Sequence, residues 1–271
     1  MQTPPEPVAT APVRRSGIAA FAAGAAIGTL GGLIGLGGAE FRLPLLIGLF
    51  GFAALQAVIM NKAMSLVVVL TALPARLVSV PVSELTPHWP IVVNLLAGSL
   101  AGAWLGATWA TRMRSSTLYR VLAALLVVIA AALAANHLGT LPSPDLPDVV
   151  RVPAGAAAGL AIGIVAALMG VAGGELLIPT IVLLFGVDIT VAGSLSLAVS
   201  LPTMLVAFAR YSRDNSFSVL RSNLGFVTSM TAGSIAGTIV GGLLLGVVSA
   251  SVLIPLLVLL LVLSAIKVWR H

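Results

Sequence analysis

The chain has 271 residues, of which 59% are hydrophobic, only 8% are charged and none is cysteine. Soluble domains carry about 25% charged residues, so this composition excludes a soluble protein, and the lack of cysteine excludes disulfide bonds and thiolate chemistry. The net charge of +6 indicates no nucleic acid partner, because in a protein that crosses a lipid bilayer several times Lys and Arg mark the cytoplasmic side.

The N-terminal stretch is rich in proline and contains few side chains to bury, so we expect a disordered cytoplasmic tail over residues 1–16. Arg14 and Arg15 precede an apolar stretch and thereby resemble the start of a signal peptide. We favour an uncleaved segment, because the apolar stretch continues into a glycine-rich break whose features recur later in the chain.

Ten apolar segments follow the tail, five on either side of a linker at residues 137–152. A membrane-spanning helix needs about 20 residues, so the second segment of each half is too short to cross alone. We therefore predict broken or re-entrant helices there. The expected segments are 17–35, 42–53, 56–80, 90–111 and 117–136, then 153–170, 177–187, 190–210, 222–246 and 250–268.

The two halves are copies of one unit. An offset of 135 residues, the distance from Gly24 to Gly159, aligns them without a gap. We therefore predict one transmembrane repeat over residues 17–136 and another over 153–271. The matches include Gly28, Gly35, Gly38, Glu40 and Pro44 in the first copy and Gly163, Gly170, Gly173, Glu175 and Pro179 in the second.

Glycines also recur at four-residue spacing in three places. Such stripes allow helix backbones to approach closely, so we interpret them as packing faces. Ser99 and Ser234 lie within two of the stripes, and we expect each to bond back to its own helix. The stripes are Gly24, Gly28 and Gly32; Gly98, Gly102 and Gly106; and Gly233, Gly237 and Gly241.

Basic residues change places between the copies. In the first copy they lie between the fourth and fifth segments, and in the second between the third and fourth. The positive-inside rule then predicts opposite orientations for the copies, cytoplasmic termini, a periplasmic linker, and three or five crossings in each copy. The expected fold is an all-α polytopic membrane protein with two inverted-topology repeats. The basic residues are Arg112, Arg114 and Arg120, then Arg210, Arg213 and Arg221.

The two glycine-rich breaks run from Gly35 to Pro44 and from Gly170 to Pro179. Matching helix breaks in two halves of a membrane chain indicate the substrate site of a transporter. The free N–H groups at the start of a short helix attract anions, and we expect each proline in the first turn. The candidate anion-binding residues are Gly35, Gly37, Gly38, Arg42, Asn61, Ser65, Gly170, Gly173, Gly174, Ser196 and Ser200.

The polar residues near the breaks each have two interpretations. Glu40 and Glu175 are candidate proton carriers, because ionisable groups at membrane depth are usually functional, or they cap the helices that follow. Arg42 pairs with the substrate or with Glu40, and its counterpart is Leu177, so the site is asymmetric. Lys62 belongs to the site or extends to the cytoplasmic face, while the serines bind substrate or their own helices.

An enzyme is not expected. The three histidines lie in predicted loops or at the C-terminus, without acidic or cysteine partners at ligand spacing. No hydrolase, zinc-protease or phosphate-loop motif occurs in the sequence. We therefore predict no catalytic residue, metal site or cofactor.

The duplicated glycine-rich stretch that ends in proline, with the Ala63–Leu66 and Ala198–Leu201 motifs, resembles the sulfite exporter TauE/SafE family of bacterial membrane permeases. The likeness covers residues 17–268. It implies transport of sulfite, sulfonates or related organosulfur anions across the inner membrane. Ala39 faces Gly174 in the alignment and Gly37 faces Ala172, so each break lacks one glycine of a full run.

We therefore expect a multi-pass secondary transporter in the bacterial inner membrane that moves a small sulfur anion by alternating access, coupled to protons. The alternatives are a passive anion channel and a membrane structural or assembly protein without substrate. The identity of the anion, the direction of transport, the coupling ion and the presence of a homo-oligomer stay open.

Overall fold

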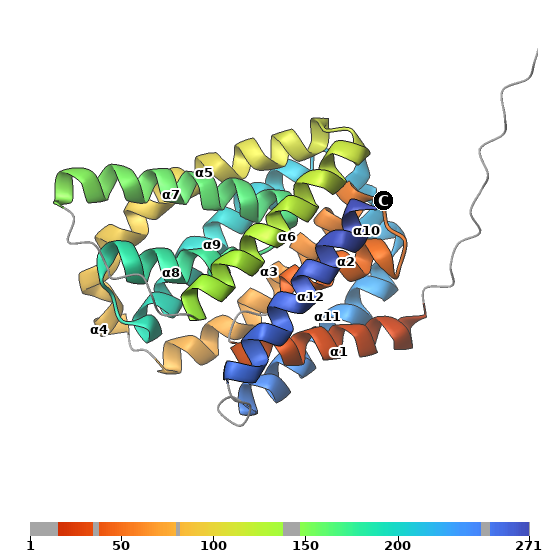
Figure 1. The fold of residues 1–271 in the computed structure, drawn as a ribbon. Coiled ribbons are helices and arrows are strands. Elements are labelled where there is room, and N and C mark those ends of the chain that lie inside the picture. The colour runs from red at the N-terminus through yellow and green to blue at the C-terminus, as the bar shows by residue number, and fades with distance from the viewer. Residues whose placement is uncertain (1–15, 35–37, 80–81, 138–146, 245–249, 271) are drawn as a thin grey trace, which may run out of the picture.

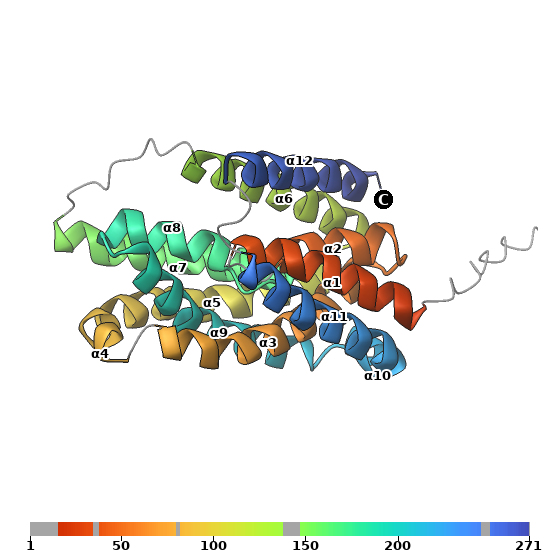
Figure 2. The same ribbon diagram turned by 90° about the horizontal axis from the view of Figure 1, so that it is seen from below.

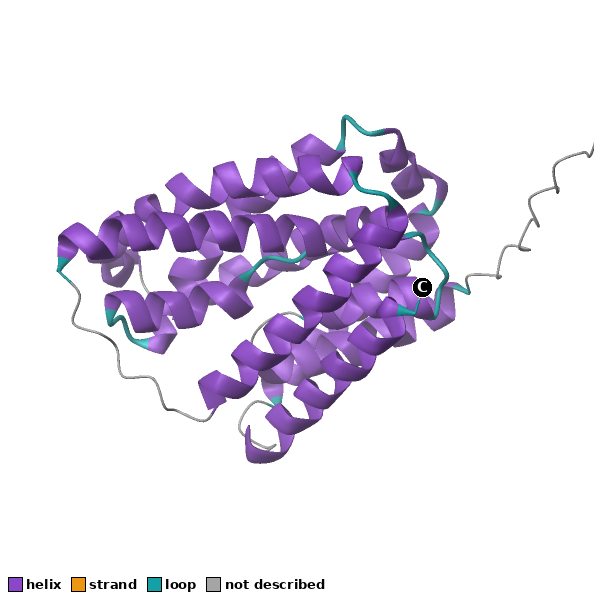
Figure 3. Ribbon diagram, turned by 45° about the horizontal axis from the view of Figure 1, so that its top comes forward, coloured by secondary structure: helices purple, strands orange, loops and turns teal. Residues whose placement is uncertain are grey.

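The computed structural model describes residues 16–34, 38–79, 82–137, 147–244 and 250–270. Every regular element within these ranges is a helix, and they contain no strand (Figure 3). The all-helical class predicted from the composition is therefore confirmed for the described part of the chain. The tail and most of the linker lie outside it.

The helices of the first half follow the predicted segments closely. They are α1 (Gly17–Ile34), α2 (Ala39–Gly48), α3 (Ala54–Ser79), α4 (Val82–Leu85), the 3-10 helix η1 (Thr86–His88), α5 (Trp89–Arg112) and α6 (Ser115–His137). The short helices α4 and η1 connect α3 to α5 and were not predicted.

The second half repeats this order. Its helices are α7 (Asp148–Met169), α8 (Gly174–Phe185), α9 (Ile189–Tyr211), the 3-10 helix η2 (Asn215–Phe217), α10 (Ser218–Ser222), α11 (Leu224–Leu243) and α12 (Ala250–Trp269). Helix α7 begins at Asp148, inside the stretch expected to be linker, so the transmembrane unit starts earlier than its apolar run.

In the described part of the chain, six helices are long and apolar enough to cross a membrane: α3, α5, α6, α7, α9 and α11. Helices α2 and α8, with 10 and 12 residues, are too short to do so, as predicted. Most of α2 is buried against other helices, and a membrane tolerates a broken helix where protein surrounds it.

The two halves hold each other by equivalent contacts. Helix α1 packs along α11, and α5 packs along α7 (Figures 1 and 2). Gly28 of α1 lies against the backbone of Ser234, and Gly163 of α7 lies against the backbone of Ser99. These residues correspond at the offset of 135, and a Cβ atom at either glycine would overlap the facing helix. The glycine stripes are therefore packing faces, as predicted.

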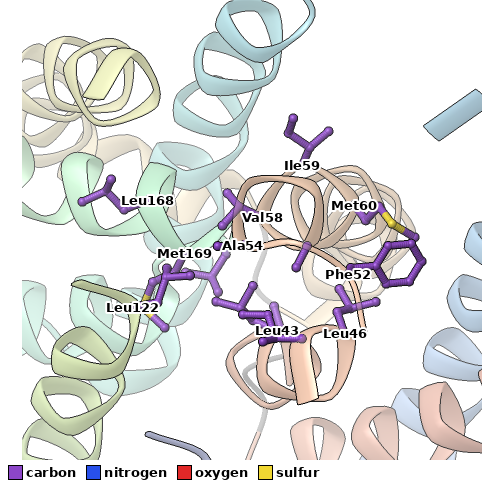
Figure 4. Close-up of a cluster of buried hydrophobic side chains, with 14 of the residues drawn as sticks. Leu43, Leu46, Phe52, Ala54, Val58, Ile59, Met60, Leu122, Leu168 and Met169 are labelled. Carbon is purple, nitrogen blue, oxygen red and sulfur yellow. The ribbon is translucent and has the colours of Figure 1, made fainter. Parts of the chain in front are cut away.

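A hydrophobic cluster joins the first break to the second. Figure 4 shows Leu43 of α2, Val58 of α3, Leu122 of α6 and Met169 of α7 side by side. All four are buried. The end of α7 therefore lies next to α2 and the first turns of α3, although more than 100 residues separate them in the chain.

Candidate functional site

Glycines with left-handed backbone set the start of both short helices. Gly38 has φ of 69° and precedes α2, while Gly173 has φ of 87° and precedes α8. Gly170, with φ of 70°, ends α7. An L side chain rarely adopts such angles, and a Cβ atom on Gly38 would lie 2.6 Å from the Ile27 carbonyl oxygen. Gly174 is less confined, and Gly35 and Gly37 lie outside the described residues.

The two prolines lie one turn later than expected. Pro44 and Pro179 are inside α2 and α8, not in their first turns, because the helices begin at Ala39 and Gly174. A proline inside a helix cannot donate to the carbonyl four residues earlier. The carbonyls left without their helical donors belong to Glu40 and Glu175.

The guanidinium of Arg42 is fully buried and surrounded by neutral oxygens. It donates from Nη1 to Asn61 Oδ1 at 3.4 Å and to Ser65 Oγ at 3.2 Å, and from Nη2 to Ser234 Oγ at 3.2 Å. Its Nε has no hydrogen-bond partner among the described residues. The structure thus brings together the three predicted residues Arg42, Asn61 and Ser65, and adds Ser234 from α11.

Asn61 connects the two breaks. Its Nδ2 donates to the Ala39 carbonyl at 3.0 Å, at the start of α2, and to the Met169 carbonyl at 3.1 Å, at the end of α7. Since its Oδ1 also accepts from Arg42, one side chain links the first break, the second break and the buried cation.

Lys62 does not extend to the cytoplasmic face, so that interpretation is wrong. Its Nζ is fully buried and donates to the carbonyls of Ala166 at 2.8 Å and Val171 at 2.6 Å. These acceptors are the last turn of α7 and the break that follows, where the helix dipole presents its negative end. Lys62 therefore holds the second break from within the protein.

Glu40 and Glu175 are each the second residue of a short helix. Their carboxyl groups interact with each other through space. Apart from each other, Glu40 Oε2 and both carboxyl oxygens of Glu175 find no hydrogen-bond partner among the described residues, although all three atoms are buried. The first-turn position suits a cap, and the free oxygens suit a proton site, so both interpretations stand.

Some of the serines contact the other residues of the candidate site, and others bond to helices away from it. Ser65 accepts from Arg42, Ser196 donates to the carbonyl of Gly193 on its own helix, and Ser200 Oγ is buried with no partner among the described residues. Ser234 and Ser99 do not bond back to their helices as expected. Ser234 accepts from Arg42, and Ser99 Oγ pairs with Thr203 Oγ1 at 2.8 Å.

The site is asymmetric, as predicted. Leu177, the counterpart of Arg42, is buried in an apolar cluster of the second half. Sequence reasoning missed Ser234, although its alignment with Ser99 inside two packing stripes was a usable signal.

A family model for the sulfite exporter TauE/SafE matches residues 20–268. The chain belongs to the TauE/SafE family. This TauE/SafE protein is therefore a multi-pass membrane transporter of sulfur anions and not an enzyme. No curated protein and no solved structure was found to match it.

Proposed function

We propose that this chain is a secondary transporter of the bacterial inner membrane. It carries a small sulfur-containing anion by alternating access around the breaks before α2 and α8, driven by the proton gradient. The anion binds between the breaks at Arg42, Asn61 and Ser65, with the glycine-rich backbone beside them. Glu40 and Glu175 are the proton-coupling groups.

The observation that carries this proposal is the set of groups that surrounds the buried guanidinium of Arg42. A buried charge is stable only when it is paired or well bonded, yet every group that accepts a hydrogen bond from this guanidinium among the described residues is neutral. A guanidinium forms its strongest bonds with oxyanions. Sulfite and sulfonates present oxygens with the required charge, and the anion would supply the missing partner.

Alternating access is supported by the arrangement of the halves. In Figure 1, α1 begins at the end of the molecule where α12 ends, whereas α7 begins at the opposite end. These positions are the ones that two inverted repeats would give to the ends of the copies, and they support opposite orientations. With α1–α2 and α7–α8 as hairpins that each enter and leave on one side, three helices of each copy cross the membrane: α3, α5 and α6, then α9, α11 and α12. Inverted repeats around a midplane site are typical of secondary transporters.

The proposal is tested in proteoliposomes. Uptake of labelled sulfite should saturate and should depend on an imposed pH gradient. A thermal-shift screen in detergent with sulfite, thiosulfate, sulfoacetate, sulfate and carboxylates identifies the preferred anion. Flux without saturation or gradient dependence would indicate a passive channel, and no anion dependence would indicate a structural protein.

We expect Arg42→Gln to lose at least ten-fold in anion affinity, because it removes the cation of the site. Arg120→Gln is the matched control, since Arg120 is exposed on α6. Equal loss in both variants, or none in either, would place the anion elsewhere.

A further inference from the structure

Four charged side chains lie together in the interior of the protein. Arg42 and Lys62 are both 0% exposed, and the carboxyl oxygens without partners on Glu40 and Glu175 are buried. The negative charge of Glu40 attracts the guanidinium of Arg42, and the negative charge of Glu175 attracts the ammonium group of Lys62. Two positive and two negative groups sum to zero when all four are ionised.

The two carboxyl groups lack donors. Beyond their contact with each other, three of their oxygens have no donor among the described residues. Pro44 and Pro179 also leave the backbone carbonyls of the same two glutamates without helical donors. While the site is empty, the positive charges of Arg42 and Lys62 offset the repulsion between the two carboxylates. An anion on Arg42 cancels one of those positive charges, and a single proton between the carboxylates then relieves their repulsion. This pair of side chains is therefore suited to bind a proton.

The other titratable groups near the pair are engaged elsewhere. The hydroxyl of Tyr211 on α9 donates to the Ala167 carbonyl at 2.9 Å. Lys267 of α12 lies beside Gly48, at the far end of α2. Arg42 and Lys62 are the charged groups that face the carboxylates from α2 and α3.

Charge balance then couples the anion to the proton. An anion with one negative charge at Arg42 would leave the buried cluster with an excess charge of −1, which is costly in a low dielectric. We infer that Glu40 and Glu175 together take up one proton when a monovalent anion binds at Arg42, so that anion and proton are carried in a one-to-one ratio. This inference rests on the proposed function and adds its stoichiometry and the charge of its substrate.

The inference makes divalent anions poor ligands. A disulfonate or a doubly ionised sulfonate would need a second proton or would leave one charge unbalanced. The preferred form of the substrate is therefore the one with a single negative charge, such as hydrogen sulfite or a monosulfonate.

The test measures protons taken up on binding. The full-length protein in detergent is titrated with methanesulfonate, which is monovalent at every pH used, in two buffers with different heats of ionisation. The difference in the measured heats gives the protons bound per anion, and we expect about one. The Kd for methanesulfonate should rise about ten-fold for each unit increase in pH, because proton uptake is linked to binding.

Single substitutions identify the acceptor. Glu40→Gln and Glu175→Gln each remove one negative charge, so each variant should bind methanesulfonate without proton uptake and with a Kd that does not depend on pH. The variant with both changes should favour ethane-1,2-disulfonate over methanesulfonate. Glu84→Gln, at an exposed residue of α4, should behave as wild type.

The outcomes separate the inference from the proposed function. Anion binding without proton uptake in the wild type would overturn the inference and leave the transporter proposal intact. Proton uptake that persists in both single variants but is lost in Lys62→Met would assign the proton to Lys62 and also overturn it. If neither sulfonate binds, and no anion in the thermal-shift screen binds either, then the proposed anion site is wrong and so is the inference that rests on it.

Discussion

At the scale of single residues, the buried polar groups near the breaks connect helices that are far apart in the sequence. Arg42 contacts α3 and α11, Lys62 contacts the end of α7, and Asn61 contacts both breaks. Each of these side chains bonds to a backbone or a hydroxyl of another helix, so each fixes the position of a break as well as its chemistry. Substitutions here will change folding and binding together, and glycines offer a cleaner test.

Gly38 and Gly51 allow two effects of an added side chain to be measured separately: the strain of a left-handed backbone and the collision with neighbouring atoms. Gly38 and Gly51 have nearly equal φ, 69° and 68°, but a Cβ atom would collide with Ile27 only at Gly38, and would meet nothing at Gly51. Gly51→Ala should therefore lower the stability by about 1–2 kcal/mol. Gly38→Ala should lower it further and also abolish anion binding, because α2 would have to move.

Thermal unfolding in detergent and calorimetric binding of the preferred anion measure both effects. If Gly38→Ala retained wild-type affinity while Gly51→Ala did not, the first break would be remote from the anion.

At the scale of helices, the glycine stripes define the two main contacts between the halves. Gly24, Gly28 and Gly32 of α1 lie against the backbone of α11, and Gly159 and Gly163 of α7, the counterparts of Gly24 and Gly28, lie against the backbone of α5. In a bilayer the helices gain little from the hydrophobic effect, so such close packing is a main source of association. These two interfaces are therefore the frame that holds the short helices in place.

We expect Gly28→Leu and Gly163→Leu to lower the unfolding temperature by similar amounts, several degrees each, because the two positions make equivalent contacts. Gly225→Leu on α11 is the control, since a Cβ atom there would meet nothing within 4 Å. Thermal unfolding in one detergent compares the three. A loss in only one of the two stripe variants would contradict the equivalence of the interfaces.

At the scale of the whole molecule, the described basic residues predict its orientation. Ser116 lies between Arg114 and Arg120, Ser212 lies between Arg210 and Arg213, and both serines are exposed. We therefore expect them on the cytoplasmic side. Ser83, exposed on α4, should be periplasmic.

The natural chain has no cysteine, so single-cysteine variants at these three serines can be labelled without background. An impermeant maleimide applied to intact cells should label Ser83→Cys and should not label Ser116→Cys or Ser212→Cys. Labelling of either cytoplasmic variant under these conditions would rule out the inverted arrangement.

The lengths of the apolar runs and the spacing of the glycines were enough to predict the helices, the two breaks and the glycine stripes. These features depend only on residues within a few helical turns of one another. Sequence reasoning also placed Arg42, Asn61 and Ser65 in one candidate site, since they are among the few polar residues of the first break and of the predicted segment 56–80. The helical register of Pro44 was misjudged by one turn, because the last left-handed glycine, and not the proline, sets the helix start. The partners of Lys62 and Ser234 depend on packing between halves, which a sequence alone does not specify.

The two bonds from Asn61 to Ala39 and Met169 limit how the breaks can separate. Any motion that opens a path between α2 and α7 must release at least one of these carbonyls. Hydrogen bonds between membrane helices contribute on average only about 0.6 kcal/mol each, which is close to the thermal energy at room temperature. The hydrogen bond from Asn61 to Met169 therefore fixes where the halves meet, at an energy small enough for thermal fluctuations to break and reform it.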